Sequence, residues 1–221
     1  MKSYVIHFIR HGMTQANLNG QYAGSWDVPL CEKGKEKLKE IKGKYDYPYV
    51  EEIYTSPLSR CKDTCEIIYN SAPIVVEGFK ECSFGDWEGK TTEELTSNPD
   101  YLKWIKGGKE IAPPNGESWN MFFERVCNSF ENVVESLMRR GVTTAAIFTH
   151  GGVIMTILSK YGIPKAPFYD WIVDNGCGYS VRITPGLWMR DKVLEVYDKV
   201  PLGASGEIEG KFKSLIDNLN K

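Results

Sequence analysis

The stretch YVIHFIRHG, residues 4–12, joins an apolar run to an arginine, a histidine and a glycine. Apart from His7, its first six residues are β-branched or aromatic, which is typical of a strand buried on both faces in a parallel or mixed sheet. We interpret His7, in mid-strand, as a packed core histidine. Arg10 and His11 fall where the strand ends, beside Gly12, whose missing side chain lets another group approach the backbone. The juxtaposition predicts an anion site at the end of a buried strand.

Further strands and helices alternate along the chain. Strands are expected at 51–55, 73–76, 144–149, 179–183 and 193–197. Helices are expected at 32–44, from Ser56-Pro57 (as cap and first helical residue) to about 70, at 117–140 and from 151 to about 161. The alternation predicts an α/β fold, a three-layer α/β/α sandwich. A hairpin across Pro185-Gly186 would make the mostly parallel sheet a mixed one.

The stretch 91–119 departs from the alternation. It combines Tyr101, Trp104 and Trp119 with a Pro113-Pro114 pair, and it predicts a helical flap inserted after a strand. Excursions of this kind often select the substrate. A structural flap with its own small aromatic core is the alternative, and the sequence leaves both open.

Composition limits the class of protein. With 221 residues, 42% of them hydrophobic, and a formal net charge of -2, the chain fits one ordinary globular domain without the basic excess of a nucleic-acid-binding protein. We expect that domain at 1–203, and at 204–221 a linker with an amphipathic helix packed on it. The apolar N-terminal run is too short for a signal peptide or a membrane span.

The chain contains six cysteines without a C-x-x-C pair. We interpret them as reduced thiols in preference to disulfides or metal ligands, and we expect a cytoplasmic protein, a monomer or a homodimer.

Two of the three histidines, His11 and His150, end predicted strands and are followed by glycine, in the second case by Gly151-Gly152. Ligands of open α/β sheets bind outside the carboxyl ends of the strands. If the two strands are parallel neighbours, both imidazoles point into one crevice. Arg60 lies in the first turn of a helix that follows another strand, so it can join Arg10 there, and the guanidinium fork suits an oxyanion.

A series of motifs in the same order resembles the histidine phosphatase superfamily, the phosphoglycerate-mutase-like clan. The motifs are the R-H-G run with Thr14 and Asn17, residues 24–34, Ser56 to Arg60 with Thr64, Glu81 to Gly89, Pro114 to Ser118, and Thr149 to Gly152. The resemblance covers roughly residues 3–185. It is nearest to the phosphatase branch, to α-ribazole phosphatases and broad-specificity phosphatases.

The resemblance implies a role for each matched residue. His11 would attack phosphorus and become a phosphohistidine, while Arg10, Arg60 and His150 hold the phosphoryl oxygens. Glu81 would protonate the leaving alkoxide and then act as a base toward water. The residues expected to bind phosphate or substrate are Asn17, Thr14, Gly24, Gly151 and Trp104. The implied mechanism needs neither a metal nor another cofactor.

The expected activity is therefore metal-independent hydrolysis of a small phosphomonoester, with α-ribazole 5′-phosphate as one candidate. The alternative is a phosphoglycerate-mutase-type phosphotransferase or isomerase. Mutases of the clan typically carry a longer, basic stretch after the acid motif, whereas 91–119 has three lysines against five acids. A non-catalytic binding module is a third possibility. It is disfavoured because all five residues expected to be catalytic are present: Arg10, His11, Arg60, Glu81 and His150. Gly85 to Thr91 ends like a phosphate-binding loop but has one residue too few between its glycines.

Overall fold

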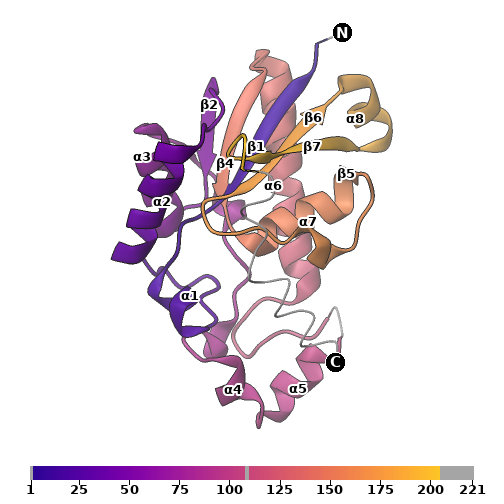
Figure 1. The fold of residues 1–221 in the computed structure, drawn as a ribbon. Coiled ribbons are helices and arrows are strands. Elements are labelled where there is room, and N and C mark those ends of the chain that lie inside the picture. Colours follow the sequence, from indigo (N-terminus) through magenta and orange to yellow (C-terminus); the bar gives the residue numbers. More distant parts are fainter. Residues whose placement is uncertain (1, 108–109, 205–221) are drawn as a thin grey trace.

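The computed structural model describes residues 2–107 and 110–204. These residues form three layers, with a central sheet between two layers of helices (Figure 1). The strands are β1 (Tyr4–Arg10), β2 (Glu52–Thr55), β3 (Ile74–Val75), β4 (Thr144–Thr149), β5 (Gly162–Ile163), β6 (Gly178–Ile183) and β7 (Leu194–Val200). The helices are α1 (Gln15–Asn19), α2 (Glu32–Lys44), α3 (Ser59–Tyr69), α4 (Thr92–Leu95), α5 (Pro99–Ile105), α6 (Trp119–Arg140), α7 (Gly151–Tyr161) and α8 (Pro185–Asp191). The predicted α/β sandwich is confirmed.

The strand order β3-β2-β4-β1-β6-β7-β5 places β1 in the middle of the sheet. β4 runs parallel to β1, with Arg10 opposite Thr149, and β2 and β3 continue the parallel direction. β6 pairs antiparallel with β1, and β7 pairs antiparallel with β6. The sheet is therefore mixed, and the two strands that precede His11 and His150 are parallel neighbours.

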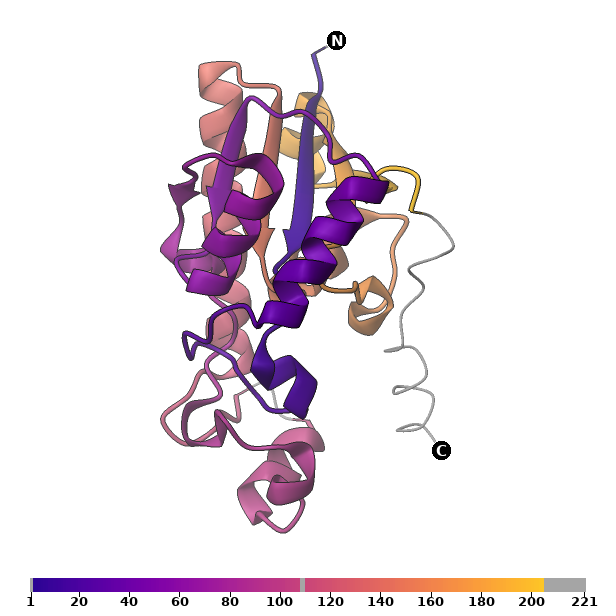
Figure 2. The same cartoon turned by 60° about the vertical axis from the view of Figure 1, so that its left-hand side comes forward.

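Apolar clusters fill both sides of the sheet, because successive β1 side chains point to opposite faces. Ile6 and Phe8 pack with Phe130 of α6 on one face, and Ile9 packs with Leu38 of α2 on the other. Figure 2 shows α2 and α3 in front of the strands and α6 behind them. Coverage on both faces explains why the β1 sequence is a continuous apolar run.

His7 is a core histidine, as predicted. Its side chain is buried in the middle of β1, and its Nδ1 lies 2.8 Å from the hydroxyl of Ser180 on β6. Burial lowers the pKa of His7 to about 4, so the imidazole is neutral near pH 7.

The predicted tight hairpin between the last two strands is wrong. β6 and β7 are antiparallel, but α8 separates them. Pro185 begins this helix, a position at which the missing N–H and the fixed φ of proline are favourable. Trp188 then anchors the helix, with its ring centroid 5.7 Å from that of Phe130 and 5.3 Å from that of Tyr161. The predicted linker and helix at 204–221 lie outside the described residues, except for Ala204.

We call the excursion at residues 91–119 the cap. Its helices α4 and α5 lie beyond the carboxyl ends of β1 and β4 (Figures 1 and 2). Leu95 and Tyr101 are buried there with Trp87, and the Tyr101 hydroxyl lies 2.8 Å from that of Tyr22. The cap thus shares a small apolar core with Trp87, and Tyr22 connects this core to the segment that follows α1.

Candidate active site

His11 and His150 come together at the carboxyl ends of β1 and β4. Arg10 and Thr149 end the two strands and lie opposite each other, so the residues that follow them, His11 and His150, also lie side by side. The backbone N–H of His11 donates to the carbonyl of Thr149 at 2.9 Å, and the imidazole centroids are 5.1 Å apart. Both side chains are buried.

The His11 ring has a defined orientation. Its Nδ1 lies 2.6 Å from the carbonyl oxygen of Gly12. A carbonyl can only accept, so Nδ1 carries the proton and Nε2 keeps its lone pair. Burial, and then the charges of Arg60 and Arg10, hold the pKa of His11 well below its ordinary value. The result is a neutral imidazole with a nucleophilic nitrogen beside two cations.

The backbone that orients His11 is fixed from two sides. The N–H of Gly12 donates to Thr64 Oγ1 at 2.8 Å, and that hydroxyl donates to the carbonyl of Arg60 at 2.6 Å. From the other side, Asn175 Nδ2 donates to the carbonyl of His11 at 2.9 Å and lies 3.3 Å from that of Gly12. Thr64 belongs to a motif quoted above, whereas nothing in the sequence analysis pointed to Asn175.

Arg60 and His150 hold each other in place. Arg60 Nε donates to His150 Nδ1 at 3.3 Å, so the proton of the neutral His150 ring lies on Nε2, which is 2.8 Å from Ser56 Oγ. Arg60 also donates to the carbonyls of Trp26 at 2.7 Å and Gly24 at 2.6 Å. Burial, and then the Arg60 charge, lower the pKa of His150 well below its ordinary value.

The predicted start of α3 is wrong. The helix begins at Ser59, with Leu58 as its N-cap residue, not at Ser56-Pro57. The Ser56 hydroxyl is engaged by His150 instead of capping the helix. The carboxylate of Asp27 accepts from the N–H and the hydroxyl of Ser59, both at 2.7 Å, and so takes the capping role.

The Arg10 side chain lies near Gly151. Arg10 Nη1 donates to the carbonyl of Val173 at 2.7 Å. A Cβ placed on Gly151 would be 3.6 Å from Arg10 Nε, so the guanidinium lies against the first residue of α7. The side chain of Arg10 therefore extends from the end of β1 toward the N-terminus of α7.

Glu81 reaches the N-terminus of α7. Its carboxylate accepts from the N–H of Gly152 at 2.9 Å and from that of Cys82 at 3.0 Å. A Cβ on Gly152 would lie only 2.4 Å from Glu81 Oε1, so a side chain at this position would displace the carboxylate.

The structure places the remaining predicted binding residues in two groups. Thr14 caps α1, and its N–H donates to the side-chain oxygen of Asn17 at 3.0 Å. Gly24 has a positive φ of 49° and presents its carbonyl to Arg60. Trp104 lies in the cap instead, half-buried against Phe84 with ring centroids 6.0 Å apart.

The described residues contain no group of three or more His, Cys, Asp or Glu side chains that could hold a metal ion. In residues 2–107 and 110–204 no helix is long and apolar enough to cross a membrane. The six cysteines are free thiols.

Known proteins resemble this chain in sequence and in fold. A family model described as histidine phosphatase superfamily (branch 1) matches residues 6–194. The adenosylcobalamin/alpha-ribazole phosphatase of Escherichia coli (strain K12) is 25% identical over 79% of this chain and 88% of its own. The uncharacterized phosphatase PhoE of Bacillus subtilis (strain 168) is 30% identical over 81% of this chain and 89% of its own.

Mutases are also among the relatives, since the 2,3-bisphosphoglycerate-dependent phosphoglycerate mutase of Cytophaga hutchinsonii is 28% identical over 70% of this chain and 75% of its own. Among solved structures, the alpha-ribazole phosphatase from Shigella flexneri superposes with a TM-score of 0.74 at 24% identity, over 87% of this chain and 94% of its own, which shows a common fold. The family match extends from β1 into β7 and includes both histidine-bearing strand ends. The chain therefore belongs to the histidine phosphatase superfamily, branch 1.

Proposed function

We propose that this phosphatase hydrolyses small phosphomonoesters through a phosphohistidine on His11. The observation that carries the proposal is the orientation of the His11 ring. Its Nδ1 proton is directed to the Gly12 carbonyl, which leaves the Nε2 lone pair for attack, and the ring is neutral between two arginines. A nucleophilic intermediate of this kind divides a difficult displacement into two easier steps.

In the first step the lone pair of His11 Nε2 forms a bond to phosphorus. The bond from phosphorus to the ester oxygen breaks, and its electron pair leaves with the alkoxide. Glu81 donates a proton to that oxygen, so the product is a neutral alcohol. Glu81 suits this role because its carboxyl group is held at the N-terminus of α7, close to the strand ends that carry both histidines.

In the second step Glu81, now a carboxylate, accepts a proton from water. The water oxygen bonds to phosphorus, the bond from phosphorus to Nε2 breaks, and its electron pair returns to the imidazole. Inorganic phosphate is released and the starting protonation state is restored.

Two arginines would compensate the charge of the phosphoryl group. Arginine has five N–H donors, and Arg60 uses three of them on His150, Trp26 and Gly24. Two donors therefore remain for phosphoryl oxygens, and Arg60 is already held in place before the ester arrives. Preorganised donors of this kind stabilise developing charge without reorganisation. Arg10 supplies the second cation.

The substrate class is inferred from the cap. The rings of Tyr22, Phe84 and Trp104 are mutually in contact, with centroid separations of 4.8 to 6.4 Å. An aromatic wall favours an ester whose alcohol carries a ring over a second phosphate or a carboxylate. Two relatives are named alpha-ribazole phosphatases, which supports α-ribazole 5′-phosphate as one candidate.

The free thiols support a reducing, cytoplasmic location.

Phosphate release from p-nitrophenyl phosphate tests the proposal directly. We expect turnover in EDTA without a bisphosphoglycerate activator, because the described catalytic groups are all side chains and backbone N–H groups. The assay is repeated with 2- and 3-phosphoglycerate. Interconversion of the phosphoglycerates that is faster than hydrolysis would reassign the protein to the mutases.

A further inference from the structure

Glu81 lies on a segment without regular support of its own. It falls between two short 3-10 turns, Glu77–Phe79 and Gly85–Trp87, and belongs to neither a strand nor an α-helix. A proton donor must be held to within a fraction of an ångström of its acceptor, so some other part of the molecule has to fix this backbone.

Arg125, on α6, donates to successive carbonyls of this segment. Its Nη1 lies 2.9 Å from the carbonyl of Gly78 and 3.1 Å from that of Lys80, and its Nη2 lies 3.5 Å from that of Glu81 itself. The segment also lies close against α6, since a Cβ on Gly78 would overlap the Ser129 side chain at 1.7 Å.

Glu117 completes the clamp from the other side. It forms two bonds with Arg125, Nε to Oε1 at 2.8 Å and Nη2 to Oε2 at 2.7 Å, and the two side chains are only 28% and 16% exposed. Its carboxylate accepts from the N–H of Ser83 at 3.2 Å, and its own N–H donates to the Ser83 carbonyl at 2.9 Å. The backbone is thus fixed on both sides of Glu81.

A second connection lies just beyond. The N–H of Asp86 donates to the carbonyl of Pro114 at 3.0 Å, and Asn115 Nδ2 donates to both carboxylate oxygens of Asp86 at 3.1 Å. A Cβ on Gly85 would be 2.0 Å from the Pro114 carbonyl oxygen, so the backbones of these two segments are in direct contact. The motif from Pro114 to Ser118, which had no predicted role, therefore packs against the segment that carries Glu81.

We propose that Glu117 and Arg125 are positioning residues for proton transfer by Glu81. The inference rests on the proposed function, because it assumes that Glu81 protonates the leaving group. Arg125 and Glu117 act through the backbone of Glu81 and do not touch the ester. Their loss should therefore weaken the first step in proportion to how much the leaving group needs a proton.

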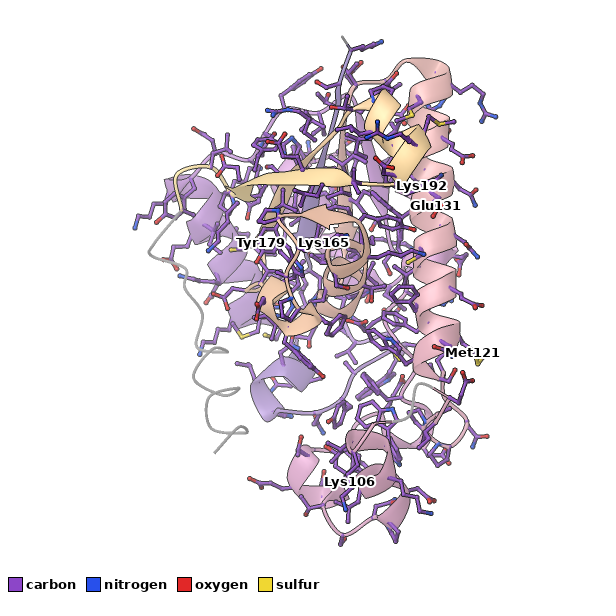
Figure 3. The ribbon with its side chains drawn as sticks, turned by 90° about the vertical axis from the view of Figure 1, so that its right-hand side faces the viewer. Lys106, Met121, Glu131, Lys165, Tyr179 and Lys192 are labelled. Carbon is purple, nitrogen blue, oxygen red and sulfur yellow. The ribbon has the colours of Figure 1, made fainter. Side chains whose placement is uncertain are left out.

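The chain offers a matched control pair. Arg140, the last residue of α6, forms two bonds with Glu52 on β2, at the end of α6 away from the cap. Figure 3 shows α6 along its length, with Met121 at the end beside the cap. Arg125 is one turn from Met121, whereas Arg140 is about 22 Å farther along the helix. The control pair has the same chemistry and similar exposure and is remote from Glu81.

The test compares kcat/KM for p-nitrophenyl phosphate, whose leaving group needs little protonation, with kcat/KM for β-glycerophosphate, whose alkoxide needs a proton. This constant reports the steps up to departure of the alcohol and is not affected by hydrolysis of the phosphoenzyme. We expect Arg125→Met to lower it by roughly 10–100-fold for β-glycerophosphate and by less than about threefold for p-nitrophenyl phosphate. Arg125→Lys should recover part of the loss, and inhibition by inorganic phosphate should stay within about twofold, because the phosphate site is untouched.

Arg140→Met should leave the ratio of the two constants unchanged, even where it lowers Tm. If Arg125→Met does not fold, Glu117→Gln takes its place, since it preserves the side-chain shape and an acceptor for Ser83. Glu81→Gln should lose more activity on β-glycerophosphate than on p-nitrophenyl phosphate. If it does, but Arg125→Met loses equally on both esters or loses nothing, the inference is overturned. If Glu81→Gln itself shows no selectivity, the acid role in the proposed function fails, and the positioning role fails with it.

Discussion

The three histidines are all buried, yet each meets a different partner. His7 meets a serine hydroxyl, His11 a backbone carbonyl, and His150 an arginine together with a serine. Burial is the largest cause that lowers the pKa of each ring. Two of the rings are placed for chemistry by their neighbours, whereas His7 contributes only to the core.

Acid should destabilise the protein partly through His7. Unfolded, this ring binds a proton near its ordinary pKa of 6.5, whereas the folded ring does so only near pH 4. The unfolded state therefore binds more protons between these values, and stability is present above about pH 6.5 and is lost as the pH falls toward 4. His7→Asn, which keeps a polar atom near Ser180, should remove about 2–3 kcal/mol of the loss between pH 7 and pH 4.5.

Urea unfolding of the wild-type and His7→Asn proteins at the two pH values measures this difference. His11 and His150 act in the same direction and remain in both proteins, so they cancel in the comparison. An identical fall in the free energy of unfolding in both proteins would show that His7 is not the source.

At the residue scale the sequence located groups that end strands but not those that orient them. Arg10, His11 and His150 were found because polar residues after apolar runs stand out. Asn175 was missed because its amide acts on the carbonyls of His11 and Gly12, which are distant in the chain. The sequence predicts Ser56 as a helix N-cap, because a serine before proline matches that position. Its observed partner, His150, is 94 positions away, and no local pattern reveals it.

At the scale of elements, the N-terminus of α7 carries much of the site. Gly151 faces Arg10, and Gly152 faces Glu81. The two glycines are adjacent in one helical turn but differ in the space around them. A Cβ built on Gly151 would lie 3.6 Å from the nearest side-chain atom, whereas a Cβ built on Gly152 would lie only 2.4 Å from its nearest side-chain atom. Alanine favours a helix over glycine by up to about 1 kcal/mol, so neither substitution should destabilise the helix through its backbone propensity.

Gly152→Ala should therefore displace the Glu81 carboxylate and lower kcat/KM on an alkyl phosphate by roughly 10–100-fold. Gly151→Ala should cost clearly less, because its methyl group makes an ordinary contact. Steady-state kinetics of the two variants on β-glycerophosphate checks the difference. Losses of the same size at both positions would indicate that displacement of Glu81 is not the cause of the loss.

Hydrophobic periodicity predicted most helices and strands, but it did not determine the residues at which they begin and end. The 22-residue helix α6 was expected because its apolar residues recur at helical spacing, and Ser118 caps it one residue before the helix begins. The insertion of α8 could not be foreseen, because Pro185-Gly186 is equally typical of a turn. What decides for a helix is the burial of Trp188 against α6 and α7, a tertiary contact.

For the whole molecule, the arrangement of the cap beyond the strand ends bears on substrate choice. The sequence left open whether the cap selects substrates or only packs on itself, and the structure shows an aromatic cluster in which Trp104 is half-buried, as are Tyr22 and Phe84. Trp104→Ala should raise KM for phenyl phosphate by about 3–10-fold, the loss of one aromatic contact, and change KM for β-glycerophosphate less. Equal changes for both esters would favour the purely structural role.

The central claim is that His11 is the nucleophile. It is tested most directly by trapping the intermediate in Glu81→Gln, whose phosphoenzyme should persist because water lacks its base. After incubation with ³²P-labelled p-nitrophenyl phosphate, whose leaving group needs little protonation, and an alkaline quench, we expect a label that is stable to base, labile to acid and located on the peptide that contains His11. The double variant His11→Ala, Glu81→Gln should carry no label. The same adduct in that double variant, or a label on the His150 peptide, would contradict the account.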